Sequence, residues 1–350
     1  MIRFIFQVQL VFTFLFLLPC SQTEASALPV FDTAAKQVPG STTASRPATS
    51  TEAVVLGKRA DISVSKARPG KARPGKARIA GSGLQYSRLP DVRKKITSRS
   101  AIIIDAQTGE TLFAKNADTP RQPASTIKVL TGMIALKSLE LNELVEVSSK
   151  AAGMPRSKIY LDTKKTYKAD DLINAVLLAS ANDASVALAE KVAGSETQFA
   201  EMMTLRARLW GAENTVCRTA SGLTAEGQMS TARDLANIFR HAMQDEDFSR
   251  RMGKTKVQTS YGKLLQNHNK ALWTVDGAEG GKTGYTKAAR QTYVGQFSGD
   301  AGSIIVAVMG SETMWDDISN LVAYGFQRQK QGRMAESEMA EKGKQVALAK

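Results

Sequence analysis

The chain has 350 residues, of which 43% are hydrophobic, so it is long enough for one large domain or two small ones with a sizeable core. Its formal net charge is +14, but residues 58–95 hold twelve Lys or Arg and only two acids. A uniformly basic fold would be typical of nucleic-acid binding. The uneven distribution of charge along this chain excludes that function. Charge confined to one segment instead indicates weak attraction to an anionic surface.

Residues 1–27 are typical of a secretory signal. Arg3 precedes an apolar run over residues 4–18, and Ala25-Ser26-Ala27 matches a cleavage site. The run is shorter than the roughly 20 residues that span a bilayer. We therefore expect export to the periplasm or cell envelope, with an uncleaved anchor as the alternative. Cleavage would leave Cys217 as the only cysteine, so no internal disulfide is expected.

Residues 28–95 are predicted to be a disordered basic linker rich in Ala, Ser, Pro, Lys and Arg. A Lys-Ala-Arg-Pro-Gly pentad recurs within residues 66–78, and its Pro and Gly block both helix and sheet. A solvated spacer is the favoured interpretation. The alternative is a spacer that also adheres weakly to an anionic wall or membrane surface.

Residues 96–328 are predicted to form the catalytic domain, with order beginning near Arg99. Strands are expected at 101–105, 110–114, 281–285, 292–297 and 303–309, and helices from 125 and at 170–178, 184–192, 231–243 and 313–327. Strands thus occur at both ends, with helices in the middle. The order predicts an α+β fold, in which an antiparallel β-sheet is flanked by helices and carries an inserted all-α lobe. Residues 329–350 are expected to be a polar C-terminal tail or a frayed helix.

The first candidate motif is Ser125-Thr126-Ile127-Lys128. At a helix start this spacing places both side chains on one face. A serine hydroxyl needs a base, and a lysine can serve when burial depresses its pKa. The competing interpretation is an N-cap serine beside a lysine that reaches solvent.

The second motif, Ser180-Ala181-Asn182, is expected between two helices on a loop facing a cleft. Ser180 can pass a proton between Lys128 and a leaving amine, and Asn182 can hold Lys128 and the substrate amide. Ordinary helix capping is the alternative.

The third motif, Lys282-Thr283-Gly284, lies in a Gly-rich stretch that resembles an edge strand. A lysine and a hydroxyl there can bind a carboxylate, and glycine lets a peptide lie close to the backbone. The alternative, which the triplet alone favours, is a solvated lysine beside a turn. The preceding Gly280 and Gly281 also suggest the end of a phosphate-binding loop. We reject that function because the motif needs a glycine at Asp276 and a helix afterwards.

Other hydrolase types have less support. The chain has two histidines, His241 and His268, and no Gly-x-Ser-x-Gly elbow. No metal-ligand spacing occurs, so no cofactor is expected. His268 is expected to be structural or to line the cleft.

The ordered set of motifs resembles the D-alanyl-D-alanine carboxypeptidases, the low-molecular-mass penicillin-binding proteins. Ser180 follows Ser125 by 55 residues and Lys282 follows Asn182 by 100, as in that family. Residues 219–223 (Thr-Ala-Ser-Gly-Leu) and 275–277 (Val-Asp-Gly) add to the likeness, which covers roughly residues 95–328.

This resemblance implies a fold of the β-lactamase and penicillin-binding transpeptidase type, acting on peptidoglycan stem peptides during cell-wall biogenesis and maintenance of cell shape. Ser125 would form the acyl-enzyme, trapped covalently by β-lactams, with Lys128 as its base. Lys282 and Thr283 would bind the terminal carboxylate. The backbone amides of Ser125 and Tyr285, next to Gly284, would form the oxyanion hole.

The chain departs from the family pattern at three points, and several functions compete. Few residues follow the matched stretch, so no added C-terminal β domain is expected; Arg290 is expected to place a cation near the carboxylate site, and the basic linker has no part in the family pattern. The main expectation is a serine-type D-Ala-D-Ala carboxypeptidase that removes the terminal D-alanine, and the alternative is a D,D-endopeptidase. A β-lactamase has less support, because Glu213 lacks the Leu-Asn usual for a deacylating glutamate. A catalytically inert wall-binding protein is the remaining possibility.

Overall fold

The computed structural model describes residue 89 and residues 91–348. The predicted signal segment, the pentad repeat and most of the predicted linker lie outside the described residues.

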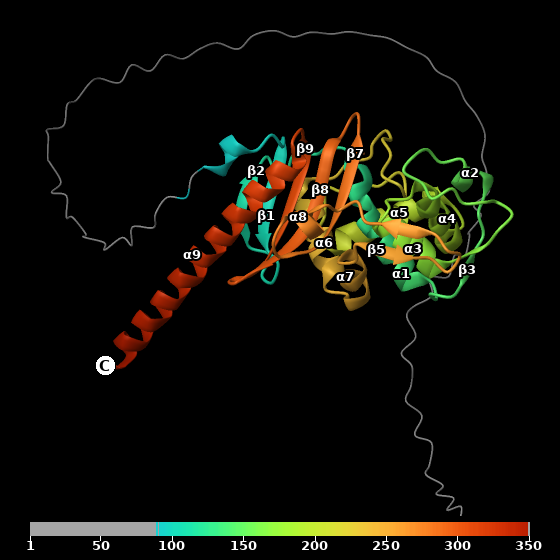
Figure 1. Cartoon of the computed structure of the whole chain (residues 1–350). Helices are drawn as coiled ribbons and strands as arrows, with labels where there is room; N and C mark the ends of the chain where they lie inside the picture. Colours follow the sequence, from blue (N-terminus) through green and yellow to red (C-terminus); the bar gives the residue numbers. More distant parts are fainter. Residues whose placement is uncertain (1–88, 90, 349–350) are drawn as a thin grey trace, which may run out of the picture. The chain divides into compact units, whose positions relative to one another are not determined.

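A five-stranded antiparallel sheet is formed by the two ends of the described chain (Figure 1). β1 (Ser100–Asp105) and β2 (Thr111–Lys115) form a hairpin, and β7 (Ala278–Thr286), β8 (Arg290–Gly299) and β9 (Gly302–Ser311) form a meander. The strand order β2-β1-β9-β8-β7 joins the two through β1 and β9 and leaves β7 at an edge. The antiparallel sheet expected from the sequence is confirmed.

Alternate residues of the central strands face two different cores. Ile102 and Ile104 face α6 (Ala232–Met243) and the helical lobe, whereas Ile103 faces α9 (Met314–Leu348). This period-2 alternation is what a sheet covered on both sides requires, and all six residues of β1 are buried.

The helical lobe is inserted between the two parts of the sheet, as predicted. Its core is shared by four helices: α1 (Lys128–Ser138), α3 (Ala169–Leu177), α4 (Asn182–Ala193) and α5 (Glu196–Leu209). The shorter elements are η1 (Val92–Lys95), η2 (Ala124–Ile127), α2 (Ser149–Ala152), α7 (Glu246–Met252) and α8 (Ala271–Thr274), with the strand pairs β3 (Leu144–Val145) and β4 (Tyr167–Lys168), and β5 (Lys256–Gln258) and β6 (Leu264–Gln266).

Two predicted boundaries differ from the structure. Order begins before Arg99, because Val92 and Ile96 are buried against α9 and the Asp91 side chain caps η1. At the other end α9 continues unbroken past Arg328 to Leu348, so of the two expectations for this segment, a tail or a helix, residues 329–348 form the helix. Among the described helices, none combines the length and the apolar character needed to cross a membrane.

Candidate active site

Ser125 lies in the single turn η2 that leads directly into α1, at the surface of a cleft. The Lys128 Nζ donates a hydrogen bond to the Ser125 Oγ at 2.9 Å. Lys128 is fully buried whereas Ser125 is partly exposed. The structure therefore brings together the hydroxyl and the amine of the first motif, with the hydroxyl on the open side.

The Lys128 amine has two further acceptors, which match the remaining hydrogens of an ammonium group. They are the Asn182 Oδ1 at 2.7 Å and the Ser221 carbonyl oxygen at 2.5 Å. Burial, and next the Lys282 cation, lower the pKa of Lys128 well below its usual 10.5, although Asp183 opposes this. The three acceptors thus hold the Lys128 amine in place, while burial and the Lys282 charge make its protonated form less stable than in water.

Ser180 lies in the loop between α3 and α4, as expected from the sequence, and lines the same cleft. Its backbone adopts a left-handed φ of 57°, a conformation that side chains other than glycine seldom adopt. The Lys282 Nζ donates to the Ser180 Oγ at 2.8 Å, and burial lowers the pKa of Lys282 to about 7. Ser180 therefore contacts Lys282, where the sequence had suggested a relay through Lys128.

Lys282 does not itself line the cleft. Only 1% of its surface is exposed, and its amine also donates to the Thr283 carbonyl oxygen at 3.1 Å. The third motif presents Thr283, Gly284 and Tyr285 to the cleft instead. Because Lys282 contacts Ser180 and does not line the cleft, its charge would act on a substrate carboxylate without direct contact.

Strand β7 runs close beside Ser125, and Gly284 makes this approach possible. A Cβ atom at Gly284 would lie 2.7 Å from the Ser125 backbone nitrogen and 2.5 Å from the Thr292 Oγ1. Both distances are too short for any other residue type. Because β7 is an edge strand, a peptide can pair with its free side next to Ser125.

The cleft has a volume of about 430 Å³ and includes groups that the sequence analysis did not identify. His268 lines the cleft, which was one of the two roles expected for it. Partial burial, with the Lys282 and Lys128 cations behind, lowers the pKa of His268, so its ring is neutral at pH 7. The other lining residues without a predicted role are Arg156, Ser157, Leu223, Gln291, Met314 and Trp315.

The structure confirms the rejection of a phosphate-binding loop and places Arg290 outside the lining of the cleft. Arg290 lies 3.7 Å from Glu312 and is not among the residues that line the cleft, although its neighbour Gln291 is. The stretch after Lys282 continues as β7 and turns into β8, so no helix follows as a phosphate-binding loop would need. Within residues 91–348 no cluster of side chains is suited to hold a metal ion.

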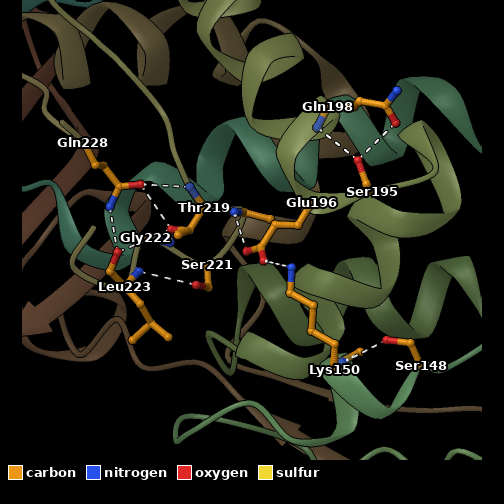
Figure 2. Close-up of polar contacts among 12 residues, drawn as sticks. Ser148, Lys150, Ser195, Glu196, Gln198, Thr219, Ser221, Gly222, Leu223 and Gln228 are labelled. Atoms are coloured by element: carbon orange, nitrogen blue, oxygen red, sulfur yellow. Dashed lines mark hydrogen bonds and ion pairs between the residues drawn. The ribbon is translucent and has the colours of Figure 1, made fainter. Parts of the chain in front are cut away.

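The segment 219–223 supports the nucleophile from behind, and the sequence analysis assigned it no role. Gly222 has a φ of 75°, and a Cβ there would lie 2.0 Å from the Ala124 carbonyl oxygen, next to Ser125. The Glu196 carboxylate accepts from the Ala220 N–H at 3.1 Å. It also pairs with Lys150 at 2.7 Å, and Figure 2 shows this pair beside the segment. The same segment carries the Ser221 carbonyl that binds Lys128. Its position therefore fixes both members of the Ser-Lys pair.

Comparison with known proteins agrees with this geometry. The family model of D-alanyl-D-alanine carboxypeptidases matches residues 87–313. A relative is D-alanyl-D-alanine carboxypeptidase DacB2 of Mycobacterium tuberculosis, with 34% identity over 64% of this chain and 81% of the relative. DacF of Bacillus subtilis is 30% identical, and the match covers 62% of this chain but only 58% of DacF.

Solved structures give the same result. A crystal structure of a D-alanyl-D-alanine carboxypeptidase from Mycobacterium tuberculosis aligns with a TM-score of 0.64 and 31% identity, covering 70% of this chain and 95% of that one. Penicillin-binding protein D2 of Listeria monocytogenes, in an ampicillin-bound form, aligns with a TM-score of 0.61 and 27% identity over 66% of this chain and 98% of that one. The chain therefore belongs to the D-alanyl-D-alanine carboxypeptidase family.

Proposed function

We propose that this protein is a serine-type D-Ala-D-Ala carboxypeptidase that removes the terminal D-alanine from peptidoglycan stem peptides. The observation that carries the proposal is the buried Lys128 amine, 2.9 Å from the Ser125 hydroxyl, beside the free edge of β7. A peptide paired with that edge would bring its last amide bond to Ser125. The family's hydrolase activity is consistent with this arrangement.

Acylation would begin with attack of the Ser125 Oγ on the carbonyl carbon of the penultimate D-alanine. The hydroxyl proton moves to the neutral Lys128 amine. The backbone N–H groups of Ser125 and Tyr285 stabilise the oxyanion, a contribution typically of a few kcal/mol. The C–N bond to the terminal D-alanine then breaks, and its nitrogen takes a proton from the Ser180 hydroxyl.

Lys282 would resupply that proton, because its ammonium donates to the Ser180 Oγ. A pKa of about 7 allows Lys282 to exist in both protonation states near neutral pH. In deacylation a water attacks the ester carbonyl and its proton returns through Ser180 to Lys282. The Ser125 Oγ leaves and recovers its proton from Lys128, so both lysines end as they began.

β-Lactams would acylate the same serine by ring opening and remain attached for a long time. Glu213, the nearest acid that could have served as a separate deacylating base, is exposed and is not among the residues lining the cleft. This position disfavours a β-lactamase. The ampicillin-bound form of the Listeria relative supports β-lactams as ligands of the family.

The proposed substrate implies a location outside the cytoplasmic membrane. Residues 1–27 would then act as the export signal, and the basic linker would contact the anionic wall or membrane surface weakly. Residues 1–27 and most of the linker lie outside the described residues, so these two roles are inferred from the sequence and from the chemistry of the substrate.

The direct test is release of D-alanine from a pentapeptide stem by the purified protein. Ser125→Ala should abolish release, while Ser138→Ala, an exposed serine at the end of the same helix, should leave it unchanged. Release that persists in Ser125→Ala would refute the proposal. The same assay on cross-linked wall separates a carboxypeptidase, which yields free D-alanine, from a D,D-endopeptidase, which yields separated peptides.

A further inference from the structure

A second hollow of about 310 Å³ adjoins the catalytic cleft in the helical lobe. The two share Arg156, Ser157 and His268, so they form one continuous groove. The second hollow contains none of the residues assigned above to the chemistry. It is lined by the loop around Tyr160 and by β6 with its preceding turn.

This loop is fixed to the start of α4 by the residues of the second motif. Asn182 donates from its side chain to the Pro155 carbonyl oxygen at 2.9 Å and from its backbone to the Ser157 carbonyl oxygen at 2.7 Å. The buried Asp183 carboxylate accepts from the Ile159 and Leu161 N–H groups. Since Asn182 also binds Lys128, the backbone of this loop holds a defined position relative to the nucleophile.

Three cations gather in the second hollow around one aromatic ring. The Lys158 and Lys263 amines lie 5.4 and 5.5 Å from the centre of the Tyr160 ring, and the Arg156 Nε donates to the Tyr160 hydroxyl at 3.0 Å. The two amines otherwise donate to backbone carbonyl oxygens, those of Ala152 and Ile159. Among the described residues no carboxylate pairs with any of the three cations.

Tyr160 is held outward in an unusual conformation. Its φ is 62° and its side chain is 58% exposed, although it is a large aromatic residue. Such backbone conformations are unfavourable for non-glycine residues and often occur at ligand-binding positions. The ring offers an apolar surface for an aliphatic chain, with positive charge around it.

We propose that Arg156, Lys158 and Lys263 form a subsite for a carboxylate on the acyl-donor part of the stem peptide, upstream of the D-Ala-D-Ala end. This inference rests on the proposed function and names a feature of its substrate. The leaving group is a single residue, and one residue spans only about 3.5 Å, so its carboxylate stays beside the catalytic residues. The acyl-donor part is several residues long and can extend along the groove into the second hollow.

The test uses two pairs of acetylated peptides that end in D-Ala-D-Ala. In one pair the residue directly before D-Ala-D-Ala bears a side-chain carboxylate or the corresponding amide. In the other pair the residue before that one carries the acid or the amide. We expect the wild-type protein to cleave the acid of at least one pair with a kcat/KM about three- to tenfold higher, since exposed charge pairs contribute modestly. The pair showing the preference locates the carboxylate.

The preference should fall to about one in Lys158→Gln/Lys263→Gln and should decrease as salt concentration rises. Lys165→Gln is the matched control, because Lys165 is an exposed lysine of the same lobe outside both hollows, and it should retain the preference. Labelling with fluorescent penicillin verifies that each variant is folded, and the salt dependence of the wild type provides a test that needs no variant.

Equal rates for acid and amide in both pairs would overturn the inference, as would a preference that survives in the double variant or does not respond to salt. Failure to release D-alanine from any of the four peptides, the amides included, would instead refute the proposed function, and the subsite with it.

Discussion

Gly222→Ala tests whether segment 219–223 positions the nucleophile. The substitution places a Cβ 2.0 Å from the Ala124 carbonyl oxygen at a φ of 75°. The left-handed conformation costs about 1–2 kcal/mol for a residue with a Cβ. The overlap with backbone atoms adds about 1–3 kcal/mol, as in other overpacked sites. We therefore expect a loss of about 2–5 kcal/mol in the free energy of unfolding.

Gly211→Ala is the matched control for this experiment. Gly211 has a similar φ of 72°, but the nearest atom to its Cβ would be the Asn237 Nδ2 at 3.9 Å. It should lose only the conformational part, about 1–2 kcal/mol. The difference between the two variants then measures the contact with Ala124, and denaturant unfolding followed by fluorescence gives both values.

The acylation rates of the two variants should differ in the same direction as their stabilities. Relief of the overlap in Gly222→Ala must move Ala124, so the acylation rate with a fluorescent penicillin should fall about 100-fold, as expected for a misplacement of roughly 1 Å. Gly211→Ala should acylate at the wild-type rate. Equal stability losses in the two variants together with wild-type acylation in Gly222→Ala would refute the reasoning.

Two further predictions concern the charges behind the site. Glu196→Ala should slow penicillin acylation about tenfold, because it leaves a buried N–H without its acceptor, which costs about 1–3 kcal/mol of free energy. Glu196→Gln should restore most of the rate, and an unchanged rate in Glu196→Ala would contradict this prediction. A pH profile of D-alanine release should show kcat/KM falling as pH rises through about 7, where Lys282 loses its proton. Stability should change in the opposite direction, because between about 7 and 10.5 only the unfolded chain keeps Lys282 protonated. The melting temperature should therefore rise more between pH 7 and pH 9 in the wild type than in Lys282→Gln, and identical slopes would refute the assigned pKa.

Local patterns were enough to predict most of the sheet. Residues 101–104 and 304–309 are continuous apolar runs, and a central strand buried on both faces needs such a run. The amphipathic α6 was also predicted within one residue of its true start. By contrast, α5 was missed because its apolar residues do not form one face: Leu205 and Leu209 are 60% and 77% exposed.

The site was predictable as far as side chains carry the chemistry. Ser125 and Lys128 are three residues apart, so their contact is local, and Ser180 and Asn182 line the cleft that was expected beside their loop. The contributions that were missed come from backbone groups or from residues far away in the sequence. No sequence pattern indicates that the Ser221 carbonyl oxygen accepts a hydrogen bond from Lys128. The Glu196 contact with Ala220 depends on the packing of α5.

The contact between Ser180 and Lys282 was not predicted, for a similar reason. The relay from Lys128 was inferred from motif order alone, whereas the distance between Ser180 and Lys282 is set by the pairing of β7 with the sheet. Only the folded chain shows that Lys128 donates to Ser125 and Lys282 to Ser180.

Peptide mapping by mass spectrometry after exposure to benzylpenicillin tests the central claim most directly, namely that Lys128 activates Ser125. The account predicts one penicilloyl group per molecule, attached to Ser125 in the wild type. Lys128→Gln should acylate at least 100-fold more slowly, because general-base catalysis contributes about 10²–10⁴-fold. An adduct on another residue, or wild-type acylation in Lys128→Gln, would contradict the account.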